Sequence, residues 1–342
     1  MKRNLIPLIT LMVLCAVSCK TKDSGTKEKA AQFSNELTAE EKAGGLMTPE
    51  IMWKFGRLGS LVLSPDGSTV LYSVTERDLI TEARRTNIFS VNIDGGEAVR
   101  LTNEGGSSPQ WFDGGNSIAF INNDGNLSVM DPQGSVTTVI EGLENFVAFS
   151  ISPAGGKIYF TRRVKLDQTA NEKHDLPNAR VRIIDDLMYR HWDSWSDYSY
   201  SHIFVADFNG KKVSGEKDIM EAQKFESPLS PYFDEGEISW SPDGKYIAYT
   251  TKRLRGRDYA RSTNSDIMLY EISSGREVNI SEGNKGFDRS PVFSPDGSKI
   301  AYQSMERDGY ESDLNRLFVY DIQKRTRTWI TKGWEFDVET VK

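Results

Sequence analysis

The chain has 342 residues, of which 38% are hydrophobic and 11% aromatic, and its formal net charge is −7. A chain of this length buries a sizeable core, and its aromatic content favours folded structure over disorder. Acidic and basic residues are interspersed, which argues against the basic patch that a nucleic-acid partner needs. We therefore expect a folded protein with one large or two smaller domains and no nucleic-acid partner.

Residues 1–19 have the form of a bacterial signal peptide. Two basic residues precede an apolar stretch over 5–17 that is too short to span a bilayer as a permanent helix. The stretch ends in "AVSC" at 16–19, which resembles a lipobox with Ala16 where leucine is commoner. We expect cleavage before Cys19 and lipidation of its thiol, which places the protein in the bacterial envelope, on the periplasmic side or at the outer membrane. A plain secretory peptide is the alternative.

The mature body is expected to fold without disulfides, because both cysteines, Cys15 and Cys19, lie in the signal segment. Residues 20–45 are polar and charged and read as a tether with a short helical turn or two. Folded structure is expected from residue 46 onward. Thr48 followed by Pro49 indicates a helix start, since proline is tolerated at the first helical position.

The tetrapeptide "SPDG" occurs three times, at 64–67, 241–244 and 294–297. Proline presets the φ angle of a turn, aspartate bonds back to the turn backbone, and glycine supplies a positive φ. Each copy is flanked by runs of β-branched and aromatic residues, as in "PVFSPDGSKIAYQS". Each copy therefore predicts the corner of a β-hairpin.

These corners belong to a longer repeat of four short strands with a period of roughly 35 to 50 residues, which is typical of propeller blades. We expect an all-β chain with five blades, at about 56–105, 107–143, 145–228, 234–285 and 287–333. The closing "WEFDVETVK" resembles the first strand of a sixth blade. The prediction is an incomplete propeller of seven or eight blades over 46–342, and a closed five-bladed propeller is the alternative.

Two stretches carry a resemblance to a known family. "MTPEIMWKFGRLGSLVLSPDG" opens the folded part, and "DLMYRHWDSWSDYSYSHIFV" spans 186–205. Over residues 47–342 the chain resembles the N-terminal propeller of serine peptidases of the prolyl oligopeptidase family, in the acylaminoacyl-peptidase and dipeptidyl peptidase V branch. The resemblance implies a propeller that limits access of short peptides to an α/β-hydrolase domain with a Ser-Asp-His triad. SPDG blades alone also suit a TolB-like envelope propeller that binds a protein partner, which is the alternative function.

Catalytic residues are not predicted within this chain. A G-x-S-x-G nucleophile elbow does not occur, and the nearest string, "GGSSP", lies at a blade junction. The three histidines, His174, His191 and His202, show neither triad partners nor metal-ligand spacing. We therefore predict no metal and no cofactor, and we expect the chain alone to be inactive as a peptidase.

A long insertion at about 162–200 interrupts the third unit. Within it, Val181, Ile184 and Met188, followed by Trp192 or Trp195, recur at helical spacing. The pattern predicts a helix, with Pro177 near its start. An insertion of this length in a repeat protein often lies on the binding face, whereas a helix packed over a blade edge is the structural alternative.

The insertion also supplies the groups that bind a peptide. A free amino end needs a carboxylate, a carbonyl or carboxylate suits a bidentate arginine, and aromatic faces favour cations. Such groups gather within seven residues, which we take as candidate substrate-binding residues: Tyr189, Arg190, His191, Trp192, Asp193 and Trp195. We expect Asp193 to meet the amino end, with Asp185, Asp186 and Asp197 as alternatives.

Overall fold

The computed structural model describes residues 35–131, 133–141, 148–175, 178, 181–184, 186–230 and 235–342. Cys19 and the signal segment, together with Asp185 and Pro177 of the insertion, lie outside the described residues. Within the described part of the chain, no helix is long and apolar enough to cross a membrane.

From residue 35 onward, two short helices precede the first sheet. α1 (Ala39–Gly44) begins at Thr38, whose hydroxyl accepts the Glu41 N–H at 3.2 Å while the Glu41 side chain accepts the Thr38 N–H. α2 (Pro49–Lys54) begins at Thr48, as predicted, with proline at its first position.

In the described residues, five antiparallel sheets of four strands follow, each a simple up-and-down meander. The first holds β1 (Arg57–Leu63), β2 (Thr69–Arg77), β3 (Arg84–Asn92) and β4 (Val99–Arg100), and the second holds β5 (Ser107–Phe112), β6 (Ser117–Ile121), β7 (Leu127–Met130) and β8 (Val136–Ile140). The third holds β9 (Phe149–Ile151), β10 (Lys157–Lys165), β13 (Ser199–Phe208) and β14 (Val213–Asp218). The fourth holds β15 (Ile238–Trp240), β16 (Tyr246–Thr251), β17 (Asp266–Glu271) and β18 (Glu277–Asn279), and the fifth holds β19 (Asp288–Phe293), β20 (Lys299–Ser304), β21 (Arg316–Asp321) and β22 (Thr326–Trp329). The predicted all-β propeller fold is confirmed.

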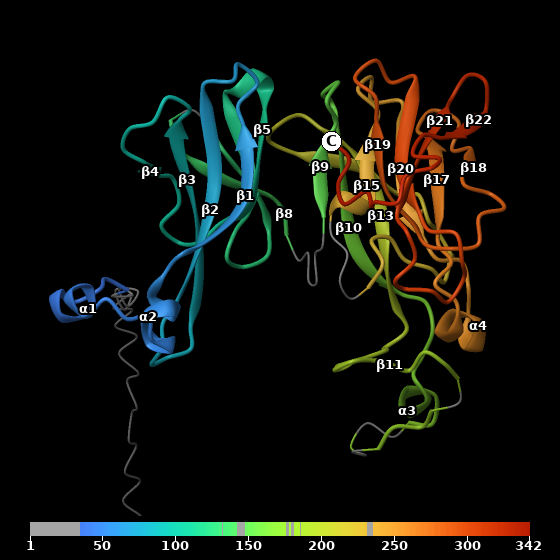
Figure 1. The fold of residues 1–342 in the computed structure, drawn as a ribbon, viewed down its shortest axis with the longest axis horizontal. Helices are drawn as coiled ribbons and strands as arrows, with labels where there is room; N and C mark the ends of the chain where they lie inside the picture. The colour runs from blue at the N-terminus through green and yellow to red at the C-terminus, as the bar shows by residue number, and fades with distance from the viewer. Residues whose placement is uncertain are drawn as a thin grey trace, which may run out of the picture.

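Among the residues that the structure describes, the core consists of four apolar clusters, each between two consecutive sheets. Leu71 meets Phe120 between the first and second sheets, and the clusters between later sheets include Phe160, Tyr249 and Tyr302. No buried cluster joins the fifth sheet to the first among the described residues. Figure 1 shows the first two sheets at one end of the long axis and the last three at the other.

Exposed apolar side chains lie on β1 and in the C-terminal segment. On β1, Leu58 and Leu61 are 70% and 69% exposed, and near the C-terminal end Phe336 is 78% exposed. Residues 334–342, predicted as the first strand of a further blade, contain no strand. A strand needs a neighbouring backbone to pair with. The backbone of this segment is instead bonded by a side chain of the fifth sheet, since the Gln303 amide donates to the Glu339 carbonyl at 2.9 Å.

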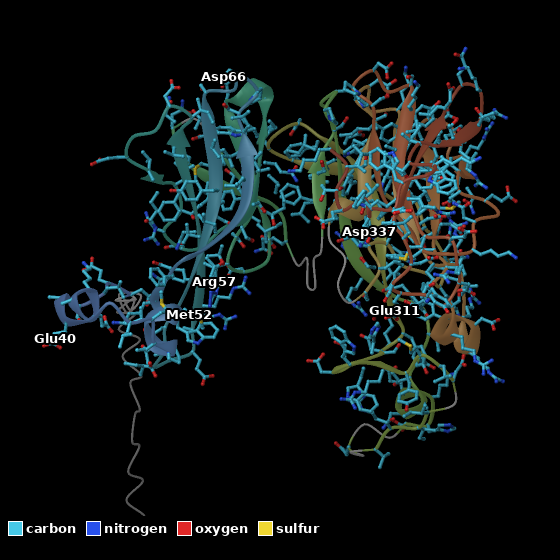
Figure 2. The ribbon with its side chains drawn as sticks, viewed as in Figure 1. Glu40, Met52, Arg57, Asp66, Glu311 and Asp337 are labelled. Atoms are coloured by element: carbon cyan, nitrogen blue, oxygen red, sulfur yellow. The ribbon has the colours of Figure 1, made fainter. Side chains whose placement is uncertain are left out.

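The SPDG corners have the predicted local chemistry. In the first, the Asp66 carboxylate accepts the Ser64 hydroxyl at 2.5 Å and the Ser68 N–H at 3.0 Å, and Gly67 has a φ of +74°. These bonds, with the one from the Ser64 hydroxyl first, lower the pKa of Asp66 to about 2. Figure 2 shows Asp66 at the end of the first sheet opposite to Met52 of α2.

Replacing Gly67 by alanine is expected to lower the free energy of unfolding by about 1 kcal/mol, because a Cβ is disfavoured at positive φ. The added Cβ meets no atom within 4 Å, so the cost is conformational and not steric. Gly44→Ala is the matched control, since Gly44 is equally open but lacks a positive φ. Denaturant unfolding of both variants checks the prediction, and equal midpoints would contradict it.

Candidate functional site

A cavity of about 430 Å³ lies between the insertion and the third and fourth sheets. Its walls come from the ends of β10 and β13, from the segment after β14 and from the loop that carries α4 (Gly256–Arg261). In Figure 1 the insertion, with β11 (Arg190–His191), and α4 project from the same end of these sheets. The lining residues with charged or aromatic side chains are Arg163, Asp167, Asp186, Arg190, His191, Trp195, Tyr198, Tyr200, Lys224, Phe225, Glu226, Arg255 and Tyr259.

The insertion is not the helix that the spacing predicts. It contains α3 (Ala170–Lys173) and a tight hairpin, in which β11 pairs with β12 (Ser194–Trp195). Trp192 lies in the turn with a φ of +47°, which an α-helix cannot accommodate. The stripe that would have to be buried also finds no core, because Val181 and Ile184 are exposed. The helical prediction for this segment is therefore wrong.

Trp195 is held by charged neighbours instead of by a core. The Arg182 and Arg190 guanidinium groups lie 4.1 Å and 5.2 Å from the centre of its ring, and the Tyr189 ring stacks at 6.1 Å. Arginine on indole is the strongest cation–π combination in proteins. The hairpin therefore has its own local packing and presents one edge to the cavity.

Three of the six candidate substrate-binding residues line the cavity. Arg190, His191 and Trp195 line the cavity, whereas Tyr189, Trp192 and Asp193 do not. Asp193 lies in the exposed hairpin turn, so its carboxylate does not face the cavity that the insertion forms. Among the alternatives, Asp186 lines the cavity, and Asp197 pairs with Arg163 at 3.1 Å.

Glu226 is a cavity carboxylate that the sequence patterns did not predict. It lies in the irregular segment after β14, is partly buried, and accepts the Ser230 N–H and hydroxyl, both at 3.2 Å. Burial raises the pKa of Glu226 above its ordinary value, in spite of these two hydrogen bonds. A carboxylate with a raised pKa in a cavity is a typical ligand-binding group.

Two tyrosines flank this carboxylate. Burial raises the pKa of Tyr259, and the negative charges of Glu226 and of ionised Tyr200 contribute to the same shift. Burial likewise raises the pKa of Tyr200, with contributions from Asp167 and Glu226. Both phenols are therefore neutral at physiological pH, and both lie close enough to Glu226 for its charge to affect their ionisation. A carboxylate among aromatic faces suits an ammonium group.

The other charged groups of the cavity differ in how they are paired. Lys224 contacts Asp167 at 2.5 Å, and Arg163 also donates to the Ser199 carbonyl at 2.8 Å. Arg255 packs over the Phe225 ring at 5.1 Å and has no ion pair within the described ranges. The cavity is thus lined by a positive charge that forms no ion pair with a described carboxylate.

The three histidines lie in different elements of the described part of the chain. His202 is fully buried, with Nδ1 2.7 Å from Asp218 and Nε2 2.8 Å from the Gln223 carbonyl, so it links β13 to the segment after β14. His174 ends α3. Over the described ranges, no group of three histidine, cysteine, aspartate or glutamate side chains is placed to hold a metal ion.

Gly256 is the point where the fourth sheet's loop contacts the insertion. Its φ is +54°, and a Cβ there would lie 2.8 Å from Oδ1 of Asp186. That carboxylate oxygen also accepts the Leu187 N–H at 2.8 Å. A side chain at residue 256 must therefore displace the Asp186 carboxylate of the insertion.

Gly256→Ala is expected to loosen the insertion by about 1 to 2 kcal/mol, through strain at positive φ and the clash with Asp186. Trypsin should then cut at Arg182 or Arg190 several-fold faster than in the unaltered chain. Gly67→Ala is the control, because it carries the same backbone strain far from the insertion. Equal cleavage rates in the two variants would show that residue 256 does not hold the insertion in place.

The comparisons with known proteins agree with the fold. No family model matches the chain. It is 39% identical over 312 residues to dipeptidyl-peptidase 5 of Porphyromonas gingivalis, a match that covers 89% of this chain and 46% of that protein. The dipeptidyl-peptidase 5 of Porphyromonas endodontalis is 37% identical over 301 residues, covering 85% of this chain and 43% of the relative. The chain spans about half the length of the curated relatives it matches.

Among solved structures, an acylaminoacyl peptidase of Pyrococcus horikoshii superposes with a TM-score of 0.61 at 18% identity. The match covers 84% of this chain and 41% of that one, and it supports the propeller fold. The relationship that the "MYRHWDSW" segment and the SPDG blades predicted is confirmed by these matches. The chain is a β-propeller of the peptidase family that includes dipeptidyl-peptidase 5.

Proposed function

We propose that this propeller binds the amino end of short peptides for an exopeptidase of the dipeptidyl- or acylaminoacyl-peptidase type, and that it limits which peptides reach the catalytic site. The observation that carries the proposal is the partly buried Glu226 carboxylate in the insertion cavity, beside Tyr200 and Tyr259. The relatives are named for the removal of dipeptides, a reaction that requires recognition of a free amino end.

The chemistry of the cavity suits that task. An ammonium group donates up to three hydrogen bonds, and a carboxylate with its own hydrogen-bonded oxygens accepts them strongly. Neutral tyrosine faces add cation–π attraction and exclude water. The raised pKa of Glu226 has a further consequence: as the pH falls, this carboxylate takes up a proton earlier than an ordinary glutamate, and amine binding should weaken.

The test compares two single substitutions in the full chain. Glu226→Gln should weaken the binding of a free-amine tripeptide amide about 10- to 100-fold, the range expected for one charge-assisted hydrogen bond in a partly buried site. Asp193→Asn is the matched control and should leave binding unchanged, since Asp193 lies outside the cavity. Calorimetric titration measures both. A loss with Asp193→Asn and none with Glu226→Gln would refute the assignment.

The catalytic step belongs to groups outside residues 1–342 in this proposal. The sequence contains no G-x-S-x-G elbow, so we expect the chain by itself to bind peptides without cleaving them. A dipeptidyl chromogenic substrate tests this. Release of the chromophore by the purified chain, blocked by a serine-directed fluorophosphonate, would overturn the proposal.

We further propose that a lipid on Cys19 anchors the protein in the bacterial envelope. The support is the lipobox-like "AVSC" after an apolar stretch too short for a permanent span. Cells grown with an alkyne fatty acid should label the protein, and Cys19→Ala should abolish the label and shift the protein to the soluble fraction. Equal labelling of both forms would contradict the anchor.

A further inference from the structure

The buried side chain of His202 bonds to two acceptors. His202 lies on β13 and is fully buried, with Nδ1 2.7 Å from Oδ2 of Asp218 and Nε2 2.8 Å from the Gln223 carbonyl oxygen. A backbone carbonyl cannot donate, so Nε2 carries a proton. Nδ1 faces a carboxylate, which in its ionised form can only accept. In a neutral ring, which carries a single N–H, Nδ1 would therefore direct its lone pair at the carboxylate.

A second proton on the ring removes this conflict. An imidazole is a stronger base than a carboxylate, so a proton shared by the two groups resides on the ring. The distance of 2.7 Å from Nδ1 to Oδ2 is typical of a charge-assisted N–H···O bond. The other oxygen of Asp218, Oδ1, accepts the Met220 N–H at 2.8 Å, which also suits an ionised carboxylate. The contacts therefore favour an imidazolium–carboxylate ion pair in which both ring nitrogens donate.

Two cations near this pair are already matched by carboxylates. Arg162 is the register partner of His202 across β10 and β13, and its guanidinium lies 2.9 Å from the Glu216 carboxylate of β14. Lys224, which follows the residue that Nε2 contacts, lies 2.5 Å from Asp167. Neither cation is therefore left without an anion to oppose a positive charge on the imidazole.

The pair holds a turn that leads to the cavity. Residues 219–230, which we call the wall segment, contain neither helix nor strand. At the start of the wall segment Asp218 accepts the Met220 N–H, and His202 donates to the Gln223 carbonyl. The two side chains therefore fix both ends of one turn from within β13 and β14.

The wall segment carries the groups that the proposed function uses. Phe225 and Glu226 follow this turn and line the cavity. Beyond the turn, the Thr251 hydroxyl donates to the Glu226 carbonyl at 3.1 Å, and the Ser201 hydroxyl donates to the Ser227 carbonyl at 3.3 Å. A neutral hydroxyl forms a weaker bond than an imidazolium does. The His202 bond therefore contributes strongly to the position of the Glu226 backbone.

We infer that His202 is a positioning residue for amine binding, which as an imidazolium paired with Asp218 holds the wall segment so that Glu226 faces the ligand. This inference rests on the proposed function, in which Glu226 binds the amino end of a peptide. His202 itself does not line the cavity, so it acts through the backbone of the wall segment.

Asp218→Asn separates the charge of the pair from its hydrogen bonds. Asparagine has the shape of aspartate, and its Nδ2 can donate to Nδ1 of a neutral ring while its Oδ1 accepts the Met220 N–H. Both attachments of the wall segment are then kept, but the ring no longer needs a second proton. His202→Phe is the opposite change, because it keeps a ring and removes both hydrogen bonds.

The first experiment reads the protonation of the ring by nuclear magnetic resonance of the full chain with nitrogen-15-labelled histidine. The chain has three histidines, and His174→Gln and His191→Gln assign the His202 signals by elimination. At pH 7.5 both ring nitrogens of His202 should carry protons in the unaltered chain, whereas only Nε2 should do so in Asp218→Asn. A ring with one protonated nitrogen in the unaltered chain would overturn the inference.

The second experiment titrates the same proteins with Ala-Ala-Ala-amide in a calorimeter. His202→Phe should weaken binding about tenfold, the cost of one lost hydrogen bond at a buried carbonyl, whereas Asp218→Asn should bind within about twofold of the unaltered chain. Asp207→Asn is the matched control, since Asp207 pairs with Lys157 in the same sheet and lies outside the cavity. It should change neither readout.

Two binding results would contradict the positioning role. One is a folded His202→Phe variant that binds as tightly as the unaltered chain. The other is a tenfold loss in Asp218→Asn, which keeps both hydrogen bonds, and this result does not depend on whether His202→Phe folds.

The two proposals fail in different ways. If Glu226 does not bind the amino end, Glu226→Gln leaves the affinity unchanged, while the ring of His202 still shows two protonated nitrogens. If His202 does not position the wall segment, Glu226→Gln loses affinity but His202→Phe does not.

Discussion

Trp240→Ala is expected to lower the free energy of unfolding by about 3 to 5 kcal/mol, the range for removal of a buried large aromatic side chain. Trp240 is buried at the junction of the third and fourth sheets. Its ring lies 5.9 Å from that of Tyr159, and its indole N–H donates to the Ser150 carbonyl at 3.1 Å. The substitution removes both of these contacts that Trp240 makes with the third sheet.

The same junction supports the cavity, because Glu226 and Tyr200 come from the third unit while Arg255 and Tyr259 come from the fourth. Trp240→Ala should therefore weaken peptide binding as well as stability. Trp240→Phe is the conservative control: it keeps most of the packing, loses one hydrogen bond, and should cost about 1 to 2 kcal/mol. Denaturant unfolding measures both. An alanine variant no less stable than the phenylalanine variant would contradict this role of the ring.

The unaltered chain is expected to lose stability as the pH rises toward neutrality. Asp288→Asn is expected to abolish this pH-dependent loss. Asp288 is fully buried at the start of β19, and Nδ2 of Asn284 lies 3.1 Å and 3.2 Å from its two carboxylate oxygens. Burial raises the pKa of Asp288 to about 7, and hydrogen bonds from Ser304, Ser281 and Asn284 oppose the shift only in part.

The direction in which stability changes with pH follows from which state of the chain, folded or unfolded, keeps the Asp288 proton. Between about pH 4 and pH 7 the folded chain keeps the Asp288 proton while the unfolded chain loses it, so stability falls as the pH rises. The contribution of Asp288 to the free energy of unfolding is fully present below its pKa in the unfolded chain. It is lost above its pKa in the folded chain. A shift of about three pH units corresponds to as much as about 4 kcal/mol.

Denaturant midpoints at several pH values between 4 and 8 check the prediction. The unaltered chain should lose stability across this range, and Asp288→Asn should flatten the profile. Asp296→Asn is the control, since Asp296 has its pKa lowered to about 2, chiefly by the Ser294 hydroxyl, and titrates below the range. The same decline in all three proteins would assign the effect to other groups.

The sequence was most informative where chemistry is local. Ser64, Asp66 and Gly67 form their turn from groups at most five residues apart, so the pattern alone predicts the corner. The four-strand repeat then predicts the sheets, because strands pair with their neighbours in the chain, apart from β10 and β13, which flank the insertion. The insertion was harder to predict, since a 3.6-residue period appears by chance in a short aromatic segment and nothing local reports the turn at Trp192.

The site was predictable only in part for a related reason. The "MYRHWDSW" segment offered six residues for a ligand, of which Arg190, His191 and Trp195 line the cavity and the other three do not. Glu226 and Arg255 reach the same cavity from segments distant in the chain, through the packing of the third sheet on the fourth. No motif marks either residue, so a single sequence does not single them out.

The most direct measurement is photo-crosslinking of the full chain with a tripeptide amide that has a free amino end and a diazirine in its second side chain. Mass spectrometry then locates the labelled residues. Crosslinks on Tyr200, Phe225 or Tyr259 that disappear with the acetylated peptide and in Glu226→Gln are the predicted result. Crosslinks confined to the exposed turn at Trp192 and Asp193, or to the exposed leucines Leu58 and Leu61 of β1, would contradict a peptide site in the insertion cavity.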